Sequence, residues 1–124
     1  MQPQTEFLDS LCSMISGVVP YQCTVGPLPP CPGVSLEITA GLTETVYLDR
    51  KEGHRLTLLI LTKHKKQMEA HDMAAQIRNY LAKLSDYPDG DGYEWTSIDA
   101  QDPTWVGQQD GHIYEVTCEA TIYF

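Results

Sequence analysis

The N-terminal part of the chain carries apolar residues at helical spacing. Phe7, Leu11 and Ile15 recur every four residues, so their side chains share one face of a helix. Gly17 follows directly and is typical of a helix end. The pattern predicts an amphipathic helix over residues 5–16.

A proline-rich segment follows at residues 18–33. Five of the eight prolines fall here. Proline fixes its own backbone angle and has no N–H group, so the segment is predicted to form neither a helix nor a central strand. We expect an extended arm or a connecting loop. Two placements stay open: the arm lies on its own domain, or it reaches a neighbouring subunit.

The next part of the chain has the two-residue period of β-strands. Val34, Leu36 and Ile38 fall on one face, with polar residues between them. A second β-rich run follows, and a charged turn at residues 50–53 leads into a third, which indicates a hairpin. The predicted strands cover residues 34–39, 43–49 and 55–62.

The third of these strands is apolar on both faces. Leu56, Leu58 and Ile60 fall on one side, whereas Leu59 and Leu61 fall on the other. A strand with this composition is covered on both sides over part of its length. We therefore expect it at the centre of the sheet.

Helical spacing returns over residues 67–84, where apolar side chains form one stripe and alanines add helix propensity. An aspartate- and glycine-rich linker follows at 85–92. The remaining pattern predicts a strand over 93–98, a loop over 99–111, and a last, cleanly alternating strand over 114–124.

The predicted order is α-β-β-β-α-β-β. Runs of strands around one long helix indicate an α+β fold, with a largely antiparallel, mixed sheet and helices packed on one face. The other face is expected to be polar. We expect residues 1–124 to form a single domain, with 18–33 as its arm or loop.

The net negative charge of the chain argues against some classes of partner. The 124 residues include 8 Lys and Arg against 17 Asp and Glu, for a formal net charge of −9. This balance argues against a protein that grips nucleic acid, since that binding depends on cations neutralising phosphates. No apolar run reaches the roughly 20 residues needed to span a bilayer, and the first residues lack a secretory signal, so no membrane association is expected.

The sequence offers no metal or catalytic motif. The four cysteines lack C-x-x-C spacing, no histidines pair at metal-binding spacing, and the Asp86, Asp89 and Asp91 run fails the EF-hand pattern. We expect no metal, no cofactor and no catalytic residues. Cys12 and Cys118 are predicted to be buried thiols, and the histidines surface residues.

Large aromatic residues flank the last strands. Tyr93, Trp95 and Trp105 lie in or beside loops, where such residues often become hot spots of a partner interface. Packing over the end of the sheet is the other interpretation. Both stay open at this point.

Several segments, in this order, carry a resemblance to a known family. They are Thr45-Val46-Tyr47-Leu48-Asp49, the charged turn with Gly53, the apolar strand Leu56–Leu61, and the helical run Ala74-Ala75-Gln76-Ile77 with Tyr80-Leu81. This order and spacing over residues 34–124 resemble the minor capsid and tail terminator (head-tail joining) proteins of tailed bacteriophages. The proline arm and Arg50, which stands where such turns often have glycine, depart from the pattern.

The resemblance implies a structural virion protein rather than an enzyme. Such a protein forms a ring, commonly a hexamer, that caps the tail tube and contacts the neck or head-completion protein. It is assembled in the host cytoplasm. The negative charge fits this role, because an acidic lumen would let DNA pass without specific binding.

The expected contacts lie where the chain joins strands without supplying core faces, namely Thr45–Asp49, the hairpin turn at residues 50–54 and the 99–111 loop. The candidate interface residues are Tyr47, Asp49, Arg50, Lys51, Glu52, Trp105 and Gln108.

Two other function classes stay open. An acidic inhibitor that mimics DNA would bind a basic DNA-handling protein in a salt-sensitive manner. A small-molecule-binding or enzymatic α+β domain would use the 86–105 region, and it would need a concave pocket with converging polar groups.

Overall fold

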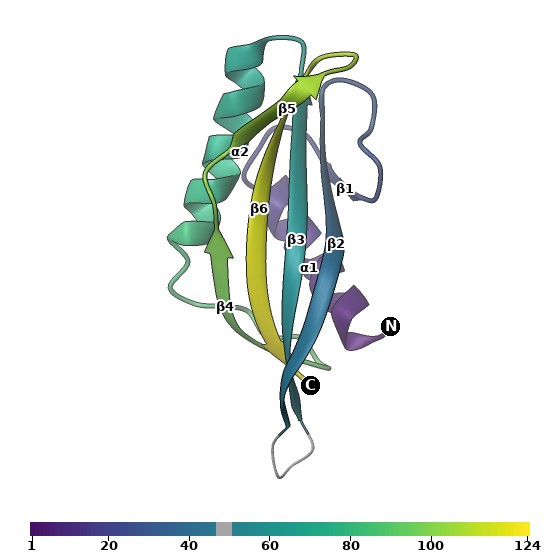
Figure 1. Cartoon of the computed structure of the whole chain (residues 1–124), viewed down its shortest axis with the longest axis vertical. Coiled ribbons are helices and arrows are strands. Elements are labelled where there is room, and N and C mark those ends of the chain that lie inside the picture. Colours follow the sequence, from purple (N-terminus) through teal and green to yellow (C-terminus); the bar gives the residue numbers. More distant parts are fainter. Residues whose placement is uncertain (47–50) are drawn as a thin grey trace.

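The protein is a curved six-stranded sheet with two helices on one face (Figure 1). The computed structural model describes residues 1–46 and 51–124. The elements, in chain order, are α1 (Pro3–Ser16), β1 (Cys23–Val25), β2 (Gly33–Val46), β3 (Glu52–His64), α2 (Gln67–Ala82), β4 (Glu94–Ala100), β5 (Thr104–Gln108) and β6 (His112–Tyr123).

The strands lie in the order β1-β2-β3-β6-β4, and β5 also pairs with β6. β1 runs parallel to β2, and every other pairing is antiparallel. β3 is central, as its sequence predicted, with β2 and β6 as its neighbours. The predicted α+β class, with a largely antiparallel sheet and helices on one face, is confirmed.

One long strand, β2, replaces the two predicted over residues 34–49. Ala40 and Gly41 were expected to separate them, but both pair with β3, opposite Thr57 and Leu56. A register shift next to Thr39 absorbs the irregularity as a β-bulge. A Cβ atom on Gly41 would lie 3.3 Å from Leu56 Cδ2, so the glycine lets the strand pass close to this core side chain.

Two short strands lie where loops were predicted. β1 lies in the proline-rich segment and pairs with Val34–Leu36, so this part of the arm lies on its own sheet. β5 lies within the predicted 99–111 loop. Strands of three and five residues are too short to display a clear alternation. α1 also begins two residues early, because Pro3 is accommodated in the first helical turn.

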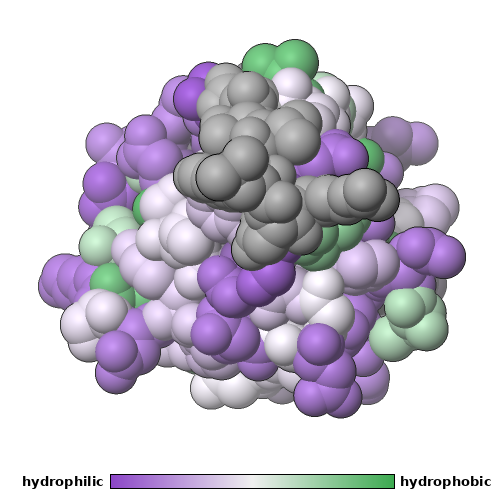
Figure 2. Space-filling view, turned by 90° about the horizontal axis from the view of Figure 1, so that it is seen from below, coloured by the Kyte–Doolittle hydropathy of each residue, from purple (hydrophilic) through white to green (hydrophobic). Residues whose placement is uncertain are grey.

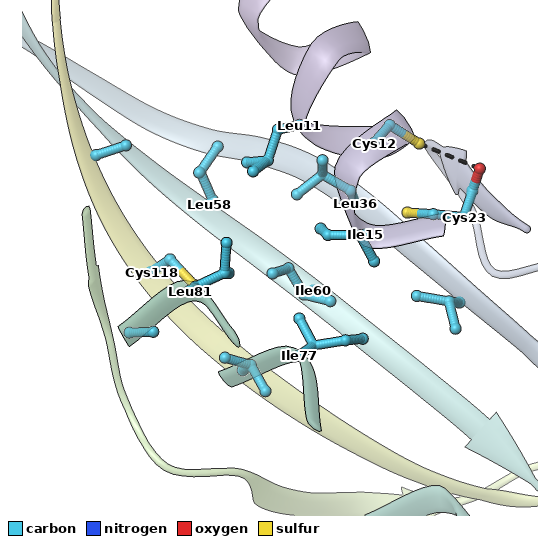
Figure 3. Packing of buried hydrophobic residues seen from close by; sticks show 14 of the residues in the cluster. Leu11, Cys12, Ile15, Cys23, Leu36, Leu58, Ile60, Ile77, Leu81 and Cys118 are labelled. Carbon is cyan, nitrogen blue, oxygen red and sulfur yellow. Dashed lines mark hydrogen bonds between the residues drawn. The ribbon is translucent and has the colours of Figure 1, made fainter. Parts of the chain in front are cut away.

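The core lies between the sheet and the two helices (Figure 3). Leu58 and Ile60 of β3 are fully buried there, as are Ile15 of α1 and Ile77 of α2. Cys118 is buried in the same layer, and burial raises the pKa of its thiol to about 12. α2 packs on this face of β3 and β6, whereas α1 packs beside it on β1 and β2, and residues of both helices join one core cluster.

The two cysteines at the α1–β1 junction are also buried. Cys12 Sγ donates a hydrogen bond to the Cys23 carbonyl oxygen at 3.1 Å (Figure 3). Burial is the main cause that raises the pKa of Cys23. Both thiols are free, as is the half-buried Cys31. The prediction of buried thiols at Cys12 and Cys118 is confirmed.

An aromatic cluster joins the start of α1 to β4. The Phe7 ring lies 5.6 Å from Tyr93 and 5.3 Å from Trp95, both in edge-to-face geometry, and Tyr87 packs on Trp95. Phe7, Tyr93 and Trp95 are buried, and Tyr87 is partly buried. Trp95 and Tyr93 therefore pack over the end of the sheet and are not exposed for a partner.

The described helices leave no membrane-spanning candidate, since none combines the required length and hydrophobicity.

Phe7→Ala tests the aromatic cluster. We expect a loss of about 3–5 kcal/mol in the free energy of unfolding, because truncation leaves a cavity between α1 and β4. Urea unfolding followed by circular dichroism measures it. Met68→Ala, at an exposed position on α2, is the control. A Phe7→Ala loss as small as that of the control would contradict the described packing.

Candidate assembly surfaces

The β2–β3 hairpin extends past the end of the sheet as a narrow projection (Figure 1). Lys51 and Glu52 lie where the chain enters β3, at the base of this projection. Seen from this end, hydrophilic residues predominate, and hydrophobic residues form separate patches (Figure 2).

Backbone pairing and ring stacking hold the base of the hairpin. The Glu52 N–H donates to the Phe124 carbonyl oxygen at 2.7 Å, and the Phe124 N–H donates to the Glu52 carbonyl oxygen at 3.1 Å. The His54 ring stacks on the Phe124 ring with centroids 3.9 Å apart and planes 4° apart. The end of the chain thus pairs with the first residues of β3 and restricts the direction of the hairpin.

A charged pair adds to this base. Lys51 Nζ lies 2.7 Å from Glu94 Oε1 of β4. Both side chains are about half exposed, so the pair contributes less than about 1 kcal/mol, and its main effect is on orientation. Beside it lies an open cavity of about 330 Å³, lined by Lys51, Glu94, Tyr123, Phe124 and the linker from Asp89 to Tyr93.

The acidic linker has a structural role that its sequence did not indicate. Asp89 Oδ1 accepts the Trp95 N–H at 3.0 Å, and the Asp91 N–H donates to Glu6 Oε1 at 2.8 Å. The linker therefore ties the first turn of α1 to the start of β4. Among the residues that the structure describes, no group of three potential metal-ligating side chains comes together.

The second candidate surface is β5, at the other end of the long axis (Figure 1). Trp105 and Val106 are each 51% exposed, which is unusual for large apolar side chains on a strand. Gln108 is exposed and pairs with His112.

The turn after β5 is held to the proline-rich arm. Asp110 and Gly111 adopt positive φ angles of 57° and 136°. Asp110 Oδ2 accepts the Cys31 N–H at 3.4 Å and lies 3.9 Å from Lys63 Nζ. These contacts restrain the position from which β5 presents Trp105.

The predicted interface residues therefore fall into two groups, not one surface. Lys51 and Glu52 lie at the hairpin end, whereas Trp105 and Gln108 lie on β5 at the opposite end. Tyr47, Asp49 and Arg50 lie outside the described residues. Sequence reasoning missed Val106, although its position beside Trp105 in a chain segment without charges was a usable signal.

The histidines are less exposed than predicted. The side chain of His54 is only 13% exposed, and its Nε2 atom is buried. His112 Nδ1 is buried too. In the described structure, neither atom has a hydrogen-bond partner. Both residues are half-buried, so the prediction of surface positions holds only in part for them, and the His54 ring is covered on one side by Phe124.

Comparison with known proteins identifies one family. The sequence profile of a family described as bacteriophage tail terminator protein matches residues 40–124, which include β3, α2, β4, β5 and β6. No curated protein shows significant similarity to the chain. The matched region contains both candidate surfaces.

Phe124→Ala tests how the hairpin base is held. We expect faster hydrogen exchange at the amides of residues 51–55 and a loss of about 1 kcal/mol in the free energy of unfolding, because the His54 stack disappears. Hydrogen exchange with mass spectrometry measures it, with Met68→Ala as control. Exchange as slow as in the wild type would show that the stack does not hold the hairpin.

Proposed function

Because the chain belongs to the bacteriophage tail terminator family, we propose that its copies form a ring, a hexamer, that caps the tail tube and contacts the neck. Family membership makes it a structural tail-related protein and a component of the virion. It favours this role over an acidic DNA mimic or an enzymatic domain.

The observation that carries the proposal is the separation of the two candidate surfaces. A protein at the joint between head and tail contacts its own copies and also different proteins along the tail axis. The hairpin and β5 lie at opposite ends of the molecule, so they are able to serve different contacts (Figure 1). We assign the hairpin to the tail tube or the neck protein, and β5 to the neighbouring copy.

The base of the hairpin supports the first assignment. A projecting segment binds more tightly when it is ordered before contact, because less conformational entropy is lost on binding. The Glu52–Phe124 pairing and the His54 stack provide such order next to the tip.

The charge of the open sheet face supports passage of DNA. The strand register places Glu37, Asp99, Glu115 and Glu119 on the face opposite the helices, and Arg55, on the same face, pairs with Glu119 at 3.0 Å. Six copies carry a formal charge of 6 × (−9) = −54. If the open face lines the lumen, it repels phosphates, and DNA moves through without specific binding.

Trp105→Ala tests the contact between copies. We expect ring assembly to weaken by about 2 kcal/mol or more, since a half-exposed tryptophan at an interface is a typical hot spot. The melting temperature of the monomer should not change. Native mass spectrometry over a concentration series measures assembly, with Met68→Ala as control. Unchanged assembly removes Trp105 from the interface.

A double variant, Tyr47→Ala with Arg50→Ala, tests the axial contact. We expect rings to form as in the wild type but to leave tail tubes uncapped, because the double variant lacks two of the side chains that the proposal assigns to this contact. Electron microscopy of purified tail tubes mixed with each protein counts the capped ends, and Met68→Ala is again the control. Normal capping by the double variant would contradict the assignment of the hairpin.

A further inference from the structure

Within the described residues, the outer edge of β2 beyond β1 and the outer edge of β5 lack a strand partner, and they lie on opposite sides of the sheet. β1 covers β2 only at Val34–Leu36, and within the described residues no strand pairs with the outer edge of β2 from Ile38 to Thr43. β5 pairs with β6 on one side, and in the described structure its other side has no strand partner. Unpaired strand edges present free N–H and C=O groups to any matching strand.

Neither open edge carries the usual protection against pairing. Residues 38–43 read Ile-Thr-Ala-Gly-Leu-Thr, and Thr104–Gln108 read Thr-Trp-Val-Gly-Gln, so both lack charges and proline. Leu42 is 57% exposed on the first edge, and Trp105 and Val106 are exposed on the second. Each edge has a bulge, but proteins that avoid edge pairing add charged side chains or proline as well.

The third edge, on β4, differs because its backbone groups already have partners. The Trp95 N–H donates to Asp89, and the Ser97 carbonyl oxygen accepts the Trp95 indole N–H at 2.8 Å. The Ala100 carbonyl oxygen accepts Arg78 Nε at 3.2 Å. β4 also carries Glu94 and Asp99. This edge is closed by side chains of its own chain.

We infer that the edge of β2 at residues 38–43 pairs with the edge of β5 at Thr104–Gln108 of the next copy, so that one sheet continues around the ring. The inference rests on the proposed ring and specifies its subunit contact. Edges on opposite sides of the sheet give a head-to-tail contact, and such a contact closes into a ring.

Strand direction agrees with this pairing. β2, β3, β6 and β5 are joined by three antiparallel pairings, so β5 runs opposite to β2. β5 lies level with Gly33–Ser35 of β2, the end that β1 covers, so pairing with residues 38–43 requires copies that are also offset along the strands. A ring axis inclined to the strands, as in a β-barrel, gives this offset and keeps neighbouring strands close to antiparallel. β2 of one copy therefore meets β5 of the next in the antiparallel sense, which is the commoner arrangement.

Cross-linking tests the pairing directly. In a Cys31→Ser background, which removes the half-buried thiol, we place cysteines at Leu42→Cys and Val106→Cys together and separately. A short bismaleimide reagent should convert the double variant into a ladder of covalent oligomers, whereas each single variant stays monomeric on a denaturing gel. Dimers from Leu42→Cys alone would show β2–β2 pairing and overturn the inference, as would a double variant without a ladder.

Charge insertion gives a second measurement. Leu42→Lys and Val106→Lys should each weaken ring assembly by about tenfold or more, because the new charge loses its water at the pairing edge. Ser97→Lys, on the closed edge of β4, is the matched control and should assemble normally. Circular dichroism checks that each variant is folded.

Native mass spectrometry of the same samples distinguishes a failure of the edge pairing from a failure of the proposed function. Rings of the wild type that persist in both lysine variants overturn the edge pairing and leave the proposed function intact. A wild type that forms no ring, alone or on purified tail tubes, overturns the proposed function together with the pairing.

Discussion

Burial of one face of β3 and β6 is the constraint on which the structure depends. Leu58, Ile60 and Val116 of this face are fully buried, α2 packs on their strands, and α1 joins the same core cluster from β1 and β2. Burial of an aliphatic side chain contributes about 1.5–3 kcal/mol, far more than the exposed ion pairs of the surface. With one face committed to the core, the open face and the strand edges remain available for other molecules.

The open sheet face and the strand edges differ in charge. The open face carries Glu37, Glu115 and Glu119 together with Arg55, which pairs with Glu119, whereas residues 38–43 of β2 and the strand β5 carry no charge. Side chains of its own chain close the edge of β4. This division fits the proposed ring, in which uncharged edges pair between copies and acidic residues of the open face repel the phosphates of DNA.

The sequence predicted the elements whose period persists over several turns or residues. The alternation of β6, the apolar run at Leu56–Leu61 and the stripe around Ile77 correspond to a last strand, a central strand and a helix. β1 and β5 were not predicted, because strands of three to five residues show no reliable hydrophobic period. Trp95 is buried because it packs on Phe7, whereas Trp105 is exposed. Local sequence does not contain such tertiary contacts, so it could not distinguish the two residues.

Electron cryomicroscopy of intact tails tests the central claim most directly. The account predicts a ring built from this chain at one end of the tube, with the acidic open face toward the channel and the hairpins directed at an axial neighbour. A tail end that lacks the chain, or a ring whose helices line the channel, would contradict it.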